Sequence, residues 1–110
     1  LAFARIYSSA TSNEINALLV VSGDAASPIY MIKNESRTIW EDVEITVNGT
    51  YRSTLARIPG EGGSTVLSAA GLFDERGRSA PPRLLITDIA VKVRDPEAEV
   101  MLLGGSVPRR

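Results

Sequence analysis

The sequence predicts an all-β fold, and two observations carry this prediction. Short apolar runs rich in Ile, Val, Thr and Tyr recur along the 110 residues, and these residue types favour strands. All six prolines lie between the runs rather than inside them, as expected of turns, because proline cannot donate a hydrogen bond within a sheet. The predicted strands span residues 15–22, 28–35, 39–47, 50–58, 63–68, 84–94 and 98–103. About seven short strands in a chain of this length are typical of an antiparallel, immunoglobulin-like β-sandwich.

The N-terminal part of the chain allows two interpretations. Thr11 and Glu14 have the spacing of a helix capping box, and apolar residues follow at helical spacing, which favours a short helix over residues 12–20. The β-rich remainder of the chain favours a first strand there instead. Residues 1–10 are compatible with an extra edge strand or with the end of an upstream membrane helix.

The domain organisation follows from this division. We expect an N-terminal arm over residues 1–14, one sandwich over residues 15–104 and a flexible tail over residues 105–110. The first residue is Leu1 rather than Met, so we expect any signal peptide or membrane anchor to precede it.

The clearest strand pattern lies in residues 42–47, where apolar and polar residues alternate. Such alternation indicates a strand with one face on the core and the other in solvent. In the run 84–94 one parity is again mostly apolar, but Ile86 and Ala90 add apolar residues to the other parity. This run is therefore predicted to be a central strand that is covered on much of both faces.

An Asn-Gly pair, Asn48-Gly49, lies between two predicted strands and is a strong hairpin signal. A two-residue loop would mix apolar and polar residues on each face, so we expect a three-residue loop with the glycine in a left-handed bulge. The expected register pairs Ile45 with Tyr51. It also sets Glu44 opposite Arg52, which brings opposite charges together.

The composition excludes several kinds of chemistry. Cysteine is absent, which removes disulfides and thiolate sites, and histidine is absent, which removes the commonest general base and metal ligand. Twelve basic against thirteen acidic residues give a net charge of −1, which argues against nucleic-acid binding. No run approaches the roughly 20 apolar residues that span a bilayer. We therefore expect a non-enzymatic protein with no catalytic residue, cofactor or metal.

Three local patterns have a chemical interpretation and a simpler one. The acids at positions 41, 42 and 44 could form a paired-carboxylate site, but alternation makes them the polar face of a strand. Asp74 and Glu75 could bind calcium, although loop acids beside arginines are more simply a solvated turn. The segments Asn34-Glu35-Ser36 and Asn48-Gly49-Thr50 match the glycosylation pattern, which indicates two exposed turns.

Trp40 is the only tryptophan and opens a predicted strand. A core position between two sheets is the simpler interpretation, and an exposed aromatic for a sugar or a protein partner is the alternative. We assign structural roles to five residues: Trp40, Asn48, Gly49, Tyr51 and Phe73.

From Ile29 to about Arg94 the order of features resembles a class of bacterial extracytoplasmic domains, immunoglobulin-like or fibronectin type III-like, found in envelope proteins. The elements are Ile32-Lys33-Asn34, the Trp-led strand to Val47, the hairpin Asn48-Gly49-Thr50-Tyr51, the Gly-led strand 63–68, and Phe73 with Gly77. The resemblance implies a sandwich and a non-enzymatic role, and it carries over no catalytic residues. The stretch before Ala17 and the second proline of Pro81-Pro82 depart from the pattern.

The expected function is that of an accessory or scaffold subunit of a bacterial, membrane-associated envelope complex, located in the periplasm or anchored facing it. Ten of the twelve basic residues are arginine, which is typical of a GC-rich bacterial genome. Arg109-Arg110 and the group Arg76, Arg78 and Arg83 could also contact acidic lipid headgroups or an acidic partner, although a solvated loop is the simpler interpretation. The alternative is a carbohydrate- or ligand-binding module of a larger secreted protein. The candidate contacts for a protein partner are Leu1, Phe3, Arg5, Tyr7, Arg76 and Arg78.

Overall fold

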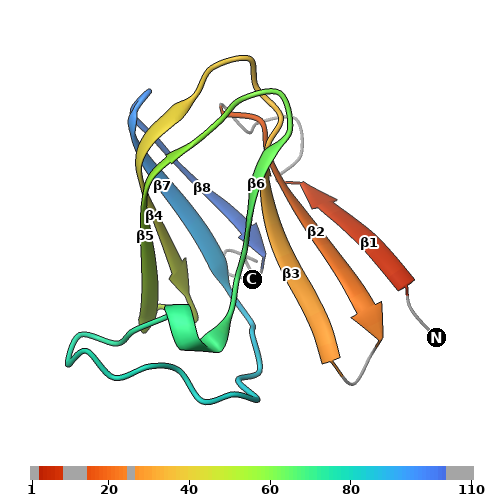
Figure 1. The fold of residues 1–110 in the computed structure, drawn as a ribbon, viewed down its shortest axis with the longest axis vertical. Helices are drawn as coiled ribbons and strands as arrows, with labels where there is room; N and C mark the ends of the chain where they lie inside the picture. The colour runs from red at the N-terminus through yellow and green to blue at the C-terminus, as the bar shows by residue number, and fades with distance from the viewer. Residues whose placement is uncertain (1–2, 9–14, 25–26, 104–110) are drawn as a thin grey trace, which may run out of the picture.

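The computed structural model describes residues 3–8, 15–24 and 27–103 and confirms an all-β sandwich of two antiparallel sheets (Figure 1). The first sheet has the strand order β1-β2-β3-β6 and the second the order β5-β4-β7-β8. The strands of the first sheet are β1 (Phe3–Ser8), β2 (Ala17–Asp24), β3 (Ser27–Asn34) and β6 (Gly63–Val66). Those of the second are β4 (Trp40–Val47), β5 (Tyr51–Ile58), β7 (Ile89–Asp95) and β8 (Ala98–Leu103).

The core lies between the two sheets and is built by alternation along the strands. Ala17, Leu19 and Val21 of β2 are buried, as are the odd-numbered residues of β7 from Ile89 to Val93. Since neighbouring side chains on a strand point to opposite faces, each sheet presents its apolar set to the other.

The N-terminal ambiguity resolves in favour of strands. Residues 17–20 belong to β2, so a helix over residues 12–20 is wrong for this part, while residues 12–14 lie outside the described ranges. Burial alternates with a period of two here, which a strand satisfies and a helix does not. The edge-strand interpretation of residues 1–10 also matches the structure, because β1 pairs along β2 from Phe3 opposite Gly23 onward. Residues 1–2, 9–14 and the predicted tail 105–110 are not described.

The β4–β5 hairpin has the predicted loop length but a different register. Its loop is residues 48–50, and Gly49 is left-handed with φ +67°. The structure pairs Val47 with Tyr51, so the predicted pairing of Ile45 with Tyr51 is wrong by two residues. A shift of two residues preserves which side chains share a face. Arg52 Nε therefore still lies 3.8 Å from Glu44 Oε2, now along a diagonal.

A reversal of alternation at Asp42 brings Trp40 into the core. Strict alternation would place Glu41 on the same face as Val43, yet Trp40 and Val43 are both fully buried and Glu41 is half-buried. Asp42 lies between them with φ +55°, a left-handed conformation that Asp tolerates better than most residues. The exposed Asp42 side chain forms an ion pair with Arg94 on the neighbouring strand.

The predicted strand over residues 84–94 is wrong for its first five residues, because β7 begins at Ile89. The side chain of Asn48 replaces a neighbouring strand there. Its Oδ1 accepts the backbone N–H of Thr87 at 2.7 Å and of Asp88 at 3.1 Å. Its Nδ2 donates to the carbonyl oxygen of Leu85 at 2.9 Å. The expectation that this strand is central is correct, since β7 lies between β4 and β8.

The opposite end of the sandwich is held by Asn34, which is fully buried. Its Nδ2 donates to the carbonyl oxygens of Thr38 at 2.8 Å and Ile58 at 3.0 Å, and its Oδ1 accepts the N–H of Ser36 at 3.0 Å. These bonds join the β3–β4 connection to the end of β5. The turn after Asn34 is exposed at Glu35, Arg37 and Thr38, as expected, but the Asn34 side chain is buried and therefore needs partners within the protein.

Candidate interaction site

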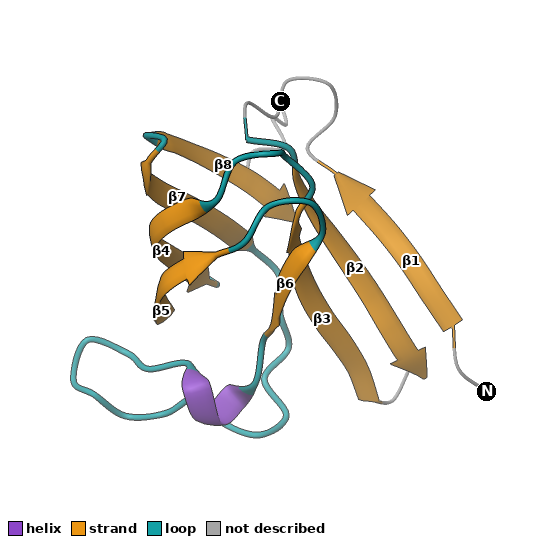
Figure 2. Cartoon of the chain, turned by 45° about the horizontal axis from the view of Figure 1, so that its top comes forward, coloured by secondary structure: helices purple, strands orange, loops and turns teal. Residues whose placement is uncertain are grey.

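The long connection between β6 and β7, residues 67–88, lies at the end of the sandwich that also carries the β4–β5 turn (Figure 1). Part of this connection, residues 73–79, extends away from the strands beyond its bridge to β5, as the long teal loop beside the purple helix of Figure 2 shows. We refer to residues 73–79 as the projecting loop. The connection also forms one side of a groove, so both candidate sites of the molecule lie at this end.

The base of the projecting loop is fastened to β5. The N–H of Phe73 donates to the carbonyl oxygen of Arg52 at 3.0 Å, and the N–H of Arg52 donates to that of Phe73 at 2.9 Å. Next to it, Leu72 is buried in the core and its carbonyl accepts the N–H of Ala80 at 2.9 Å. The loop therefore continues the second sheet for one bridge on the outer side of β5.

The tip of the projecting loop is organised by the carboxylate of Asp74. Asp74 Oδ1 accepts the backbone N–H groups of Arg76 and Arg78, each at 2.9 Å, and Asp74 Oδ2 lies 3.4 Å from Arg78 Nε. The N–H of Arg78 holds the pKa of Asp74 below its ordinary value, and the N–H of Arg76 and the charge of Arg78 act in the same direction. Gly77, with φ +82°, closes the turn. The Asp74 carboxylate therefore accepts its hydrogen bonds from the loop itself.

The exposed side chains of the projecting loop differ in whether contacts within the protein already engage them. Phe73 is 46% exposed, so its backbone rather than its ring anchors the loop. The Arg78 guanidinium is used in the ion pair with Asp74. Arg76 is exposed, and the described residues provide no ion-pair partner for it. Phe73 and Arg76 are therefore the side chains of this loop that are best placed for an external contact.

The residues predicted to contact a partner fall into two separate places. Arg76 and Arg78 lie in the projecting loop, whereas Phe3, Arg5 and Tyr7 lie on β1 at the edge of the first sheet, away from β5 (Figure 1). Leu1 lies outside the described residues. Of the residues assigned structural roles, Trp40 is fully buried, Tyr51 is half-buried, and Asn48 and Gly49 form the β4–β5 turn.

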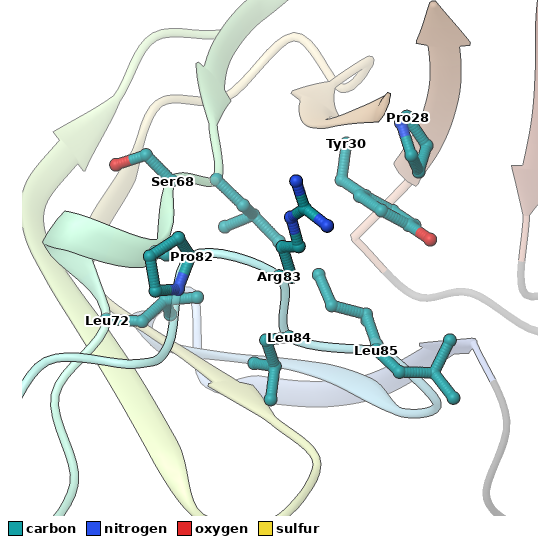
Figure 3. A pocket seen from close by; sticks show the side chains of 11 residues that line it. Pro28, Tyr30, Ser68, Leu72, Pro82, Arg83, Leu84 and Leu85 are labelled. Atoms are coloured by element: carbon teal, nitrogen blue, oxygen red, sulfur yellow. The ribbon is translucent and has the colours of Figure 1, made fainter. Parts of the chain in front are cut away.

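A groove of about 700 Å³ opens beside the projecting loop (Figure 3). Its sides come from the start of β3, the segment 67–69 after β6, and residues 82–86 before β7. Sequence reasoning did not find it, because these segments are far apart in the chain. The apolar run Leu84-Leu85-Ile86 lines the groove, but in the sequence this run predicts a strand and does not by itself indicate a groove.

Comparison with models of protein families, with curated proteins and with solved structures finds no match. In the part of the chain that the structure describes, no group of three His, Cys, Asp or Glu side chains is arranged to hold a metal ion. Within the same ranges, no helix has the length and apolar character needed to cross a membrane.

Proposed function

We propose that this chain is a non-enzymatic interaction module that binds a protein partner through the projecting loop. The observation that carries the proposal is a hydrogen-bonded loop that exposes the ring of Phe73 and the guanidinium of Arg76, which has no ion-pair partner among the described residues. Aromatic residues and arginine are enriched at protein interfaces, and arginine is common among the residues that dominate their binding energy. Because Asp74 already orders the loop, binding loses little conformational entropy.

The proposed context is an accessory or scaffold subunit of a bacterial envelope complex on the periplasmic side of the membrane. Its support is the resemblance of residues 29–94 to extracytoplasmic immunoglobulin-like domains, together with the strand order. Without β1, the sheets β2-β3-β6 and β5-β4-β7-β8 have the order expected of strands A-B-E and C′-C-F-G in such sandwiches. Modules of this kind act through loops and sheet edges.

The test is a tagged pull-down from detergent-solubilised membranes of the native host, read by mass spectrometry. One bait carries Phe73→Ser with Arg76→Ser. The matched control carries Val66→Ser with Arg57→Ser, which also removes one exposed apolar and one exposed basic side chain but lies outside the loop. Since all four side chains are exposed, both variants should have the melting temperature of the unaltered chain.

We expect the unaltered chain and the control to recover a membrane protein in fixed stoichiometry, and the loop variant to lose it. Equal recovery by both variants would contradict the role of the projecting loop. If the unaltered chain is recovered with no membrane protein bound to it, the scaffold function as a whole is contradicted.

A ligand-binding module of a larger secreted protein is the second candidate, and the groove of Figure 3 is the observation that favours it. A carbohydrate platform would need an exposed flat aromatic ring. Among the aromatic side chains that the structure describes, Trp40 is buried and Tyr30 and Tyr51 are half-buried, while Phe73 belongs to the projecting loop. The groove is therefore better suited to an apolar ligand than to a sugar.

A further inference from the structure

The groove combines apolar sides with one cation. Its volume of about 700 Å³ is in the range of small-molecule sites, roughly 300–1,000 Å³. Tyr30, Leu67 and Leu84 contribute half-buried apolar surface, and the buried Leu72 is also part of the lining. Among the described residues that line the groove, Arg83 is the one with a charged side chain.

The guanidinium of Arg83 has no acidic partner among the described residues, whose ion pairs involve Lys33, Arg52, Arg78 and Arg94. In Figure 3 the Arg83 side chain lies between those of Ser68 and Tyr30, with Leu84 and Leu85 nearby. A cation beside apolar surface complements a ligand that has an anionic end and an apolar body.

Both sides of the groove are held in place by hydrogen bonds within the protein. On one side the N–H of Leu67 donates to the carbonyl oxygen of Tyr30 at 2.9 Å. On the other side Asn48 holds the carbonyl oxygen of Leu85, and the N–H of Leu84 donates to that of Pro81 at 3.1 Å. A groove that exists before binding avoids part of the entropic cost of ordering its walls.

We propose that this groove binds a single amphiphilic molecule with a carboxylate head on Arg83 and an aliphatic chain along Tyr30, Leu67 and Leu84. A free medium-chain carboxylate fits this chemistry. A bilayer surface fits less well, because binding to an anionic membrane normally needs a cluster of basic residues, and the chain has a net charge of −1 with one cation in the groove. This inference is independent of the proposed protein partner.

The test is a titration of the isotope-labelled chain with decanoate, followed by NMR. Decanoate is kept at concentrations where it does not form micelles. We expect saturable shifts at the amides of Tyr30, Leu67 and Leu84. Arg83→Gln should weaken decanoate binding about tenfold, the usual effect of losing one partly exposed charge-assisted contact. Decanol has the same chain without the charge, so it should bind the unaltered chain and Arg83→Gln equally.

Arg57→Gln is the matched control, since Arg57 is an exposed arginine of β5 outside the groove. The affinity of this variant for decanoate should equal that of the unaltered chain. Equal weakening by Arg57→Gln and Arg83→Gln would overturn the proposal, as would the absence of saturable shifts in the groove. A second arm uses vesicles of phosphatidylglycerol. Vesicle binding that depends on Arg83 without decanoate binding would overturn the assignment of a free carboxylate.

Discussion

Replacing Asn34 by Ala removes a fully buried amide that joins the β3–β4 connection to the end of β5. The substitution breaks the hydrogen bonds to Thr38, Ile58 and Ser36 together. The carbonyl oxygen of Ile58 is the buried partner of this set, and the other partners are partly buried. The perturbation therefore acts on backbone groups that water reaches to different degrees.

The loss of stability follows from these burial differences. A buried acceptor that loses its partner costs about 1–3 kcal/mol, and each partly buried bond about 0.5–1.5 kcal/mol. For Asn34→Ala we expect a loss of about 3 kcal/mol in the free energy of unfolding, after discounting for water at the partly buried groups. Single domains are stable by about 5–15 kcal/mol, so this loss is a large fraction of the total.

Urea unfolding followed by Trp40 fluorescence measures this loss, because Trp40 is the only tryptophan and is fully buried. With a urea dependence of about 1–3 kcal/mol per molar, the unfolding midpoint should fall by about 1–3 M. Asn48→Ala is the matched control. Its side-chain bonds lie at exposed or partly buried positions, but Ala must also adopt the left-handed φ of +56° at this position, so its expected loss is about 2 kcal/mol.

A loss for Asn34→Ala that is no larger than that for Asn48→Ala would refute this reasoning. It would mean that water or a rearranged backbone satisfies the Ile58 carbonyl when the amide is absent. A change in the urea dependence itself would instead indicate an altered unfolded or native state.

Three further predictions concern single positions. Asp42→Gly should be more stable to heat than Asp42→Val by about 1–2 kcal/mol, because the left-handed conformation penalises a side chain branched at Cβ. Gly63→Ala should lower the melting temperature, because the added Cβ would collide with the carbonyl oxygen of Pro59. The pKa of Asp74, measured by NMR titration, should lie below the ordinary value of 3.8 and return toward it in Arg78→Gln less than completely, because the backbone N–H of Arg78 remains. A lowered folded pKa means that the Asp74 contribution to stability is complete above the ordinary value. This contribution is lost as the pH falls through the folded pKa.

Each of these predictions has a clear contrary result. Equal stability of the two variants at position 42 would show that β4 does not need a left-handed residue there. An unchanged melting temperature for Gly63→Ala would show that the β5–β6 turn can move aside. A pKa of Asp74 at or above its ordinary value would show that its hydrogen bonds to the loop backbone do not persist in solution.

Local patterns in the sequence predict most strands but not their exact faces or ends. The alternation around Ile45 and the turn at Gly49 depend on neighbouring residues, and both are read directly from the chain. The reversal at Asp42 depends on one backbone angle that alternation does not encode. The start of β7 depends on Asn48, a residue about forty positions earlier in the chain whose amide replaces a strand neighbour.

The candidate sites were harder to predict from the sequence, because the groove is built from segments that are far apart in the chain. Arg76 could be proposed as a contact because an arginine in a charged turn is solvent-exposed by default. The groove at Arg83 could not, because its walls come from β3, from the segment after β6 and from residues before β7. Leu84 to Ile86 were predicted as part of a strand because short apolar runs usually form strands. The local pattern cannot show that the side chain of Asn48 binds the backbone of Leu85.

The burial of Asn34 has a practical consequence for the choice of expression host. In a eukaryotic secretory pathway, both Asn34-Glu35-Ser36 and Asn48-Gly49-Thr50 are acceptor sites for a glycan on the nascent chain. A sugar attached to the Asn34 amide before folding would remove a donor that Thr38 and Ile58 require, and the buried position has no room for it. Secretion from such cells should therefore yield poorly folded material, which replacement of Ser36 by Ala would relieve only in part, because Ser36 also binds Asn34.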